Sequence, residues 1–316
     1  MAVKAINGAD LNNISEVDGR YNVLNKVNGV DADLTPPAAA YSVRNVSGLT
    51  GVPYDGPAMR ILVDATGDGA DATDLEFDIN FTADGDLDVA DIELKCTGGK
   101  DAYVVKWYDQ SGAGNDAVQT AYANMPKIAT AGVVILENGK PALDFSDISQ
   151  LTTPFDTSSS AFDLPQTMVL VTRYVSGGSF QDYNFMVSGG GGSAFGKFEM
   201  YGRPADGTYA QLRIGQGPGS AAFAKTSSFT STDMYLHSGI WGSSNMKMSY
   251  NGGSVITGAA TNSNDHTTTT LALGAVSSNI SGAFRTPEFI IWPTDQDSDG
   301  NLSGINTNTN TYFSIT

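Results

Sequence analysis

The chain has 316 residues, of which 41% are hydrophobic and only 16% are charged, and it contains 36 glycines. This length and apolar content can build a substantial core, and the abundance of glycine favours short strands joined by many turns. The 34 acidic residues outnumber the 17 basic ones and give a formal charge of −17, which argues against binding to nucleic acids or anionic membranes because phosphate groups would be repelled.

The sequence also bears on the cellular compartment. The single cysteine, Cys96, cannot form an internal disulfide bond, so we expect a fold stabilised by burial alone. The opening MAVKAINGADLNN lacks the apolar segment of a signal peptide, and no stretch approaches the roughly 18 apolar residues of a membrane span. We therefore expect synthesis in a host cytoplasm and no membrane span. If the protein works outside a cell, we expect its release by lysis as part of a particle.

Residues 1–40 contain a short repeated motif that sets them apart from the rest of the chain. Residues 14–19 (ISEVDG) are echoed by residues 24–29 (LNKVNG), and each copy ends in a turn dipeptide. Units this small cannot bury a core alone. They are either a flexible extension or an anchor that docks onto a larger assembly, and the prolines at 36 and 37 close the segment. The predicted anchor side chains are Ile14, Val17, Leu24 and Val27.

A globular domain is predicted over residues 41–316. Residues 59–63 (MRILV) read as a strand, and residues 75–81 (LEFDINF) alternate apolar and polar side chains as a half-buried strand does. Residues 87–94 (LDVADIEL) predict one short helix.

Residues 104–128 contain the most distinctive pattern. An apolar strand ends at Trp107 and leads into the polar turn of residues 108–116 (YDQSGAGND), whose residue types tolerate left-handed backbone and bond their own main chain. Asn124 precedes Met125 and Pro126, which stop any helix, and a second apolar strand follows at residues 133–136.

The remainder predicts an all-β protein. Residues 167–174 (TMVLVTRY) read as a strand buried on both faces, and residues 251–252 (NG) as a hairpin turn. Roughly ten strands without a fixed internal repeat fit a two-sheet sandwich better than a propeller. Six further strands are predicted at residues 197–201, 209–214, 234–241, 246–250, 271–273 and 288–292.

Three segments carry a family resemblance: WYDQSG (107–112) with the downstream Asn124-x-Pro126, NGKPALDF (138–145), and the closing strand, Pro293, turn and helix. Together they resemble the catalytic domain of the fungal α-L-arabinofuranosidase B family and its relatives among phage virion structural proteins. The resemblance implies a concanavalin A-like (jelly-roll) β-sandwich with a small N-terminal anchoring extension. It also implies a terminal helix with Ile305, Asn308 and Tyr312 on one side.

The resemblance further implies where catalytic groups would lie. Retaining glycosidases need two carboxyl groups about 5 Å apart. The matching segments, residues 209–216 (YAQLRIGQ) and 275–282 (AVSSNISG), contain no carboxylate. Glu199 is the nearest acidic residue that could replace the missing catalytic carboxylate. The other interpretation is that Glu199 is a structural residue of a strand. His237 and His266 have no companion nucleophile signature, so we expect no catalytic residues.

Sugar recognition needs aromatic faces together with amides and carboxylates. Two roles are open for the turn residues: contact with a glycan, or support of the loop backbone with Trp107 in the core. Loop aromatics such as Phe180, Tyr183 and Tyr201 are alternative contacts. The candidate glycan-binding residues are Trp107, Tyr108, Asp109, Gln110 and Asn115.

Two acidic clusters raise the question of calcium. Asp295, Asp297 and Asp299 follow the start of an EF-hand loop, but Asn306 stands where the bidentate carboxylate should be. Solvated turn carboxylates are the favoured interpretation here and at residues 84–88 (DGDLD), with a calcium site as the alternative. No other cofactor is expected.

These observations predict a non-catalytic virion protein of a tailed bacteriophage, serving as a capsid decoration, head fibre, tail fibre or other tail appendage. It would contact other virion proteins through residues 1–40, form a homo-oligomer such as a trimer, and display a lectin-like domain that binds host or environmental glycans weakly. One alternative is a tail-borne glycan hydrolase, an arabinofuranosidase-like depolymerase. The other is a decoration protein that binds no sugar.

Overall fold

The computed structural model describes most of the predicted globular domain. Its described residues are 5–6, 9–10, 35–64, 74–145, 148–155, 165–175, 184–189, 199–205, 209–215, 223–227, 233–242, 245–259, 271–274 and 284–316. The predicted anchor residues Ile14, Val17, Leu24 and Val27 lie outside this set. Short strands β1 (Ala5–Ile6) and β2 (Ala9–Asp10) pair with each other.

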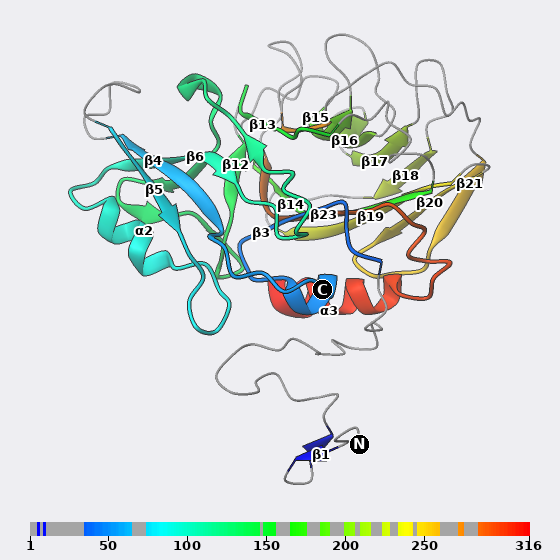
Figure 1. The fold of residues 1–316 in the computed structure, drawn as a ribbon. Helices are drawn as coiled ribbons and strands as arrows, with labels where there is room; N and C mark the ends of the chain where they lie inside the picture. Colours follow the sequence, from blue (N-terminus) through cyan, green and yellow to red (C-terminus); the bar gives the residue numbers. More distant parts are fainter. Residues whose placement is uncertain are drawn as a thin grey trace.

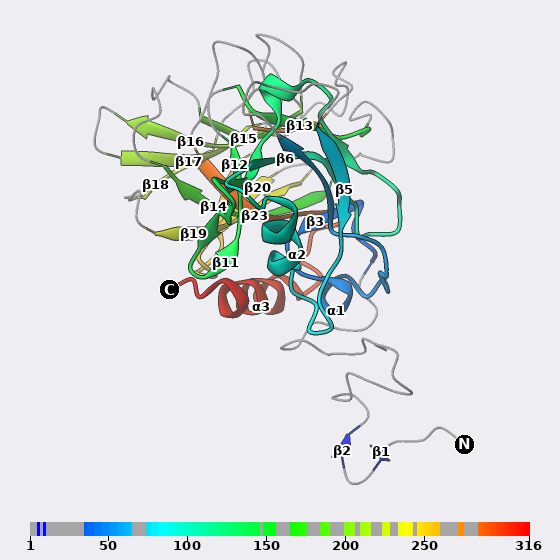
Figure 2. The same cartoon turned by 90° about the vertical axis from the view of Figure 1, so that its left-hand side faces the viewer.

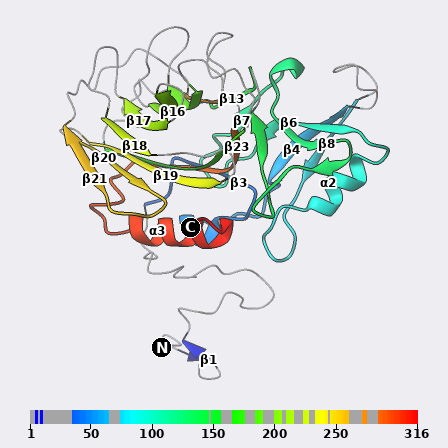
Figure 3. The same cartoon turned by 180° about the vertical axis from the view of Figure 1, so that it is seen from behind.

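The described strands form two antiparallel layers (Figures 1 and 3). The first layer has the order β3 (Ala39–Ser42), β23 (Phe284–Trp292), β14 (Gln166–Tyr174), β19 (Met234–Trp241), β20 (Asn245–Tyr250) and β21 (Ile256–Ala259). The second has the order β5 (Leu75–Ile79), β4 (Met59–Asp64), β6 (Asp101–Trp107), β7 (Ala117–Val118), β13 (Gln150–Thr152), β22 (Leu271–Gly274), β15 (Asn184–Gly189), β16 (Glu199–Ala205), β17 (Tyr209–Gly215) and β18 (Phe223–Ser227).

Two short strands connect the layers. β12 (Leu143–Phe145) pairs with β23 of the first layer and with β8 (Lys127–Thr130), which itself pairs with β6 of the second. The remaining short strands are β9 (Val133–Val134), β10 (Leu136–Glu137) and β11 (Lys140–Pro141), and the short helices are α1 (Ser47–Thr50) and the 3₁₀ turn η2 (Tyr122–Asn124). The predicted all-β sandwich is confirmed.

Aromatic side chains fill the centre of the core. Trp107, Trp241 and Trp292 are fully buried. Tyr41 stacks on Phe289 with ring centroids 6.2 Å apart, and it meets Trp107 at 5.9 Å. Since Tyr41 lies on β3, which begins at Ala39, the sandwich includes residues just before the predicted domain start at 41.

Most predicted strands appear within a few residues of their expected positions. Every residue of β14 except Arg173 is buried, as a strand between two neighbours and two packed faces requires. β5 is less buried than predicted, because it pairs with β4 alone among the described strands and leaves Leu75 61% exposed. Asn251 and Gly252 both have positive φ, which confirms the predicted turn after β20.

The two longer helices also match predicted positions. α2 (Val89–Lys95) lies within the expected region, and the Asp88 side chain caps it by accepting from the Asp91 N–H at 3.0 Å. Its neighbour Cys96 is buried, and burial raises the pKa of the thiol. Among the residues that the structure describes, no helix is long and apolar enough to span a membrane.

The terminal helix α3 (Leu302–Phe313) covers the outer face of the first layer (Figures 1 and 2). The predicted terminal helix is present, and Asn308 and Tyr312, which were expected on one side of it with Ile305, both contact Arg44. Asn308 and Tyr312 are half-buried, because the sheet beneath carries polar groups and the helix buries polar residues to meet them. Ser238 of β19, for example, donates to Asn306 Oδ1 at 2.7 Å. The buried residues of α3 are Leu302, Gly304, Ile305, Asn306, Thr309 and Phe313.

Candidate functional site

The WYDQSG turn is organised by a buried carboxylate. Asp109 Oδ1 accepts from the N–H groups of Ala40 and Ser111, each at 2.9 Å. Asp109 Oδ2 accepts from the Ser111 hydroxyl at 2.7 Å and from the Asn115 N–H at 2.9 Å. Asp109 is only 4% exposed, so both of its oxygens serve the backbone of the loop and of β3.

Gln110 and Trp107 have similar internal partners. The Gln110 amide accepts from the Val46 N–H at 2.9 Å and donates to the carbonyls of Ser42 and Arg44. The Trp107 indole N–H donates to the Ser42 carbonyl at 3.3 Å. Both side chains are fully buried. Of the two roles open for these residues, the geometry fits support of the loop, and neither presents a surface to a glycan.

Asn115 and Tyr108 are more accessible members of the predicted set. Asn115 is half-buried and donates to the Ala38 carbonyl at 2.9 Å. The half-buried Tyr108 ring follows β6 and donates its hydroxyl to Asp78 Oδ1 at 2.8 Å. Burial is the larger cause that raises the pKa of Tyr108, and the hydrogen bond to Asp78 raises it further, to about 12. Tyr108 therefore remains protonated and a donor at neutral pH.

A β-bulge determines which side chains share the surface with Tyr108. Arg60 pairs with Lys106 while Ile61 pairs with Val104, which leaves Val105 as the extra residue of β6. Because of this insertion, Tyr103 and Lys106 both lie on the outer face, although they are an odd number of residues apart. Figure 1 shows β4, β5 and β6 side by side at this part of the sandwich.

Two further tyrosines extend this surface. Tyr103 of β6 and Tyr122 of η2 have ring centroids 4.6 Å apart with an interplanar angle of 55°. Tyr122 donates its hydroxyl to Asp64 Oδ2 at 2.6 Å. Burial, and then the hydrogen bond to Asp64, raises the pKa of Tyr122. The Lys127 ammonium lies 5.2 Å from the Tyr103 ring centroid.

We name this surface the tyrosine face. It combines half-buried aromatic rings with charged side chains that can exchange hydrogen bonds with hydroxyl groups, which is the composition that sugar recognition requires. Only Tyr108 of this set could be predicted from the sequence, because cross-strand register and the bulge bring the others beside it. Its residues are Tyr103, Tyr108, Tyr122, Arg60, Lys106, Lys127, Asp64, Glu76, Asp78, Asp101 and Asp116.

The first predicted calcium loop is organised around a lysine. Lys247 Nζ lies 2.9 Å from both Asp295 Oδ2 and Asp297 Oδ2 and 3.1 Å from the Ser298 hydroxyl. Burial alone would raise the pKa of Asp295, but hydrogen bonds from Lys247 and Ser298 outweigh it and lower that pKa. Asp299 is exposed at the end of the turn. An ammonium group thus stands between two of the carboxylates proposed as metal ligands.

Replacing Lys247 with methionine is expected to lower the free energy of unfolding by about 2 kcal/mol at pH 7, because charge-assisted bonds to both aspartates disappear. Because folding lowers the pKa of Asp295, its ion pair with Lys247 contributes fully to stability above a pH of roughly 3.9, the pKa of an aspartate in the unfolded state. This contribution is lost as the pH falls through the lower pKa of the folded state. Urea unfolding from pH 7 to pH 3 should therefore show the difference between the two proteins shrinking with acidification.

The half-buried pair of Lys95 and Asp91 on α2, which is more accessible to water than the Lys247 pair, provides the control. Lys95→Met should change stability by less than about 1 kcal/mol. An equal loss in both variants would mean that the Asp295 loop contributes no more than a surface ion pair does.

The second acidic cluster is also engaged by protein groups. Asp86 accepts from Lys140 Nζ at 3.4 Å and from the Tyr312 hydroxyl, while Asp88 caps α2. Asp84 is exposed. In the described part of the chain, no group of three or more His, Cys, Asp or Glu side chains is arranged to hold a metal ion.

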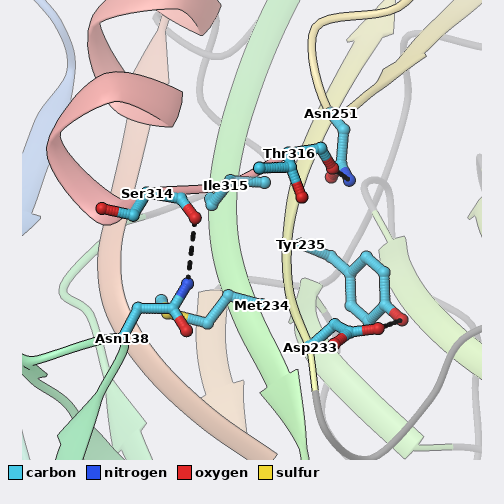
Figure 4. A pocket seen from close by; sticks show the side chains of 8 residues that line it. All are labelled: Asn138, Asp233, Met234, Tyr235, Asn251, Ser314, Ile315 and Thr316. Carbon is cyan, nitrogen blue, oxygen red and sulfur yellow. Dashed lines mark hydrogen bonds between the residues drawn. The ribbon is translucent and has the colours of Figure 1, made fainter.

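A pocket of about 200 Å³ lies between the start of β19 and residues 314–316 (Figure 4). Asn138 donates to the Ser314 carbonyl at 3.2 Å, and Asn251 donates to the Thr316 carbonyl at 3.0 Å. The amide donors of the pocket therefore hold the final residues in place. Its other lining residues are Asp233, Met234, Tyr235 and Ile315.

Most residues named in the catalytic predictions lie outside the described part of the chain. The backbone of β17 is described, but its side chains are not, and residues 275–282 are not described at all. The same holds for the side chains of Glu199 and Tyr201 and for the whole of Phe180, Tyr183 and His266. His237 is fully buried with Nε2 2.9 Å from the Thr172 hydroxyl, and burial lowers its pKa to about 3. It is thus a neutral core residue at physiological pH.

No protein-family model and no curated protein matches the sequence. Among solved structures, the fold is similar to a variant GH54 α-L-arabinofuranosidase soaked with 4-nitrophenyl α-L-arabinofuranoside, with a TM-score of 0.62 and 15% identity. It is also similar to an arabinofuranosidase complexed with arabinofuranosyl-α-1,2-xylobiose, with a TM-score of 0.62 and 16% identity. Both comparisons cover 87% of this chain and 63% of the other chain.

The chain thus spans less than two thirds of the length of these enzymes. At such identity the likeness shows a shared β-sandwich fold and nothing about the reaction. The predicted resemblance to arabinofuranosidases is confirmed at the level of the fold, and the resemblance to phage virion proteins stays a prediction.

Proposed function

We propose that this chain is a non-catalytic carbohydrate-binding protein whose tyrosine face contacts the glycan. The observation that carries the proposal is the gathering of Tyr103, Tyr108 and Tyr122 on one outer sheet surface beside charged hydrogen-bonding groups. Rings of this kind pack against the apolar faces of sugars, and the flanking groups fix the orientation of their hydroxyls. The similar arabinofuranosidase complex, with its bound arabinofuranosyl-xylobiose, is an example of the same fold holding a sugar.

Replacing Tyr103 or Tyr122 with alanine is expected to weaken glycan binding at least tenfold, since each variant removes an aromatic contact. A tenfold loss corresponds to about 1.4 kcal/mol. Binding is measured by affinity electrophoresis and calorimetry against a polysaccharide panel that includes arabinoxylan. Tyr103→Phe is the matched control, because it keeps the ring and should keep most of the affinity.

Thermal unfolding of each variant separates loss of contact from loss of fold. If the alanine variants remain folded and bind as tightly as the wild type, the tyrosine face is not the binding site.

We further propose a location on the virion of a tailed bacteriophage, with residues 1–40 docking onto other virion proteins and the chains assembled as a homo-oligomer such as a trimer. The repeated motifs of residues 14–19 and 24–29 support this proposal. Cryo-microscopy of intact particles is the test. Incorporation of a chain that lacks residues 1–34 into particles at the wild-type level would contradict the anchoring role.

The second candidate is a glycan hydrolase, favoured by the TM-score of 0.62 to arabinofuranosidases. The segments that match the family's catalytic positions contain no carboxylate, so we expect no release of 4-nitrophenol from 4-nitrophenyl α-L-arabinofuranoside. If the wild type releases 4-nitrophenol and Glu199→Gln abolishes this release, catalysis would replace binding as the proposed function.

A further inference from the structure

We infer that the tyrosine face selects neutral, extended glycans and discriminates against acidic ones. This inference rests on the proposed function and adds the chemical class of the ligand. It follows from the way in which the cations of the face are paired and from the placement of its rings along β6.

Each cation of the face is held by a carboxylate. Arg60 binds Asp78 through Nε at 2.8 Å and through Nη2 at 2.9 Å, in a bidentate arrangement. The hydrogen bond from Arg60 is the largest cause of the lowered pKa of Asp78, so this carboxylate stays ionised at neutral pH. An acidic glycan that approached Arg60 would meet the negative charge of Asp78 and also that of Glu76, whose Oε2 lies 4.0 Å from Arg60 Nη1.

The two lysines are held in the same way. Lys106 Nζ lies 3.1 Å from Asp116 Oδ2, and Lys127 Nζ lies 2.7 Å from Asp101 Oδ2. Burial alone would raise the pKa of Asp101, but hydrogen bonds from Lys127 and the Ala131 N–H lower it overall. Both carboxylates compete with any anionic ligand.

The remaining charges on the face add to this repulsion. Glu76 adds a fourth carboxylate to Asp78, Asp101 and Asp116, so these carboxylates outnumber the three cations of the face. The whole chain carries a formal charge of −17, which repels polyanions during approach. Hydroxyl groups, in contrast, can bond to the paired charges without separating them.

The spacing of the rings indicates an oligosaccharide. Tyr103 and Tyr108 are five residues apart along β6 and the residue that follows it. With a rise of about 3.3 Å per residue, and with one of the five steps taken up by the bulge at Val105, their Cα atoms are about 13 Å apart. One sugar ring cannot contact both side chains, so a ligand that does so runs along the strand.

The test compares neutral polysaccharides with acidic derivatives of the same backbone: arabinoxylan with sulfated arabinoxylan, and hydroxyethyl cellulose with carboxymethyl cellulose. The full chain is expected to bind at least one neutral polymer at least tenfold more tightly than its acidic partner. Shortening the ligand to a monosaccharide should lower the affinity at least tenfold. Tyr108→Ala should weaken polymer binding without changing monosaccharide binding at Tyr103.

Asp101→Asn tests the charge argument directly, because it frees Lys127 from its carboxylate. The ratio of acidic to neutral affinity should rise severalfold in this variant and become more sensitive to salt. Asp91→Asn is the matched control, since it frees Lys95 on α2, outside the face, and should leave the ratio unchanged.

The outcomes separate the inference from the proposed function. If the acidic polymers bind as tightly as the neutral ones or more tightly, and Tyr103→Ala abolishes this binding, the selectivity is overturned but glycan binding by the tyrosine face is not. An unchanged affinity ratio in Asp101→Asn would overturn the charge argument. Failure of every polymer to bind would overturn the proposed function itself.

Discussion

Replacing Glu288 with alanine is expected to lower the free energy of unfolding by about 3–5 kcal/mol, because it leaves a buried guanidinium without its counter-charge. Glu288 is fully buried on β23. Arg44 donates to it through Nε at 2.7 Å and through Nη2 at 2.9 Å. Ser42 and Thr309 donate their hydroxyls to the same carboxylate at 2.8 and 3.2 Å.

This ion pair joins three parts of the fold. Glu288 lies on β23, Ser42 ends β3, and Thr309 lies on α3. Arg44 also donates to Asn308 at 2.8 Å, and its guanidinium carbon lies 4.5 Å from the Tyr312 ring centroid. The helix therefore docks on the sheet through one satisfied polar network, and removal of its central carboxylate should loosen the helix together with β3.

Urea denaturation gives the measurement, and Arg60→Ala gives the control. Arg60 forms a bidentate pair with Asp78, but both side chains are exposed, at 38% and 41%. Such a pair contributes about 0–1 kcal/mol. If Glu288→Ala costs no more than Arg60→Ala, water must reach Arg44 and the network is not buried in solution.

Replacing Asp109 with alanine is expected to cost about 3 kcal/mol or more. The substitution removes the acceptor of three backbone N–H groups and one hydroxyl, and a buried donor left without a partner costs about 1–3 kcal/mol. The Ala40 N–H is the most sensitive of these donors, because Ala40 is fully buried on β3. Loss of its partner should loosen β3 at Ala40, while Gln110 and Asn115 still donate to the carbonyls of Ser42 and Ala38.

Equilibrium unfolding measures the cost, and hydrogen exchange of the Ala40 and Asn115 amides locates it. Asp299→Ala, at an exposed turn position, should change stability by less than about 0.5 kcal/mol. Slow exchange of both amides in Asp109→Ala, with a cost below about 1 kcal/mol, would show that the turn does not depend on this carboxylate.

Much of the fold could be predicted from local patterns. The apolar run of residues 168–171 identifies β14, and its burial follows from its place between two neighbours in the first layer. The short helix α2 was indicated by the apolar residues of 87–94. The side of α3 that would be buried could not be predicted, because it depends on Glu288 and Ser238 in a sheet remote in sequence.

The candidate site was harder to predict for the same reason. The residue types of the WYDQSG turn are compatible with both sugar contact and loop support, and the buried partners of Asp109 and Gln110 distinguish the two roles. Tyr122 belongs to the site through its contact with Tyr103 on another element. Lys247 on β20 likewise contacts Asp295, and a contact between residues so far apart in the sequence cannot be predicted from a local motif.

The pairing of β3 with β23 has a consequence for biosynthesis. Ala39 and Tyr41 bond with Ile291 and Phe289, so one of the earliest strands of the sandwich waits for one of the last to be translated. A nascent chain cannot complete this layer before β23 has left the ribosome, and contacts so distant in sequence form slowly. We therefore expect β3 to stay unpaired until β23 emerges, and to be a target for chaperones until then.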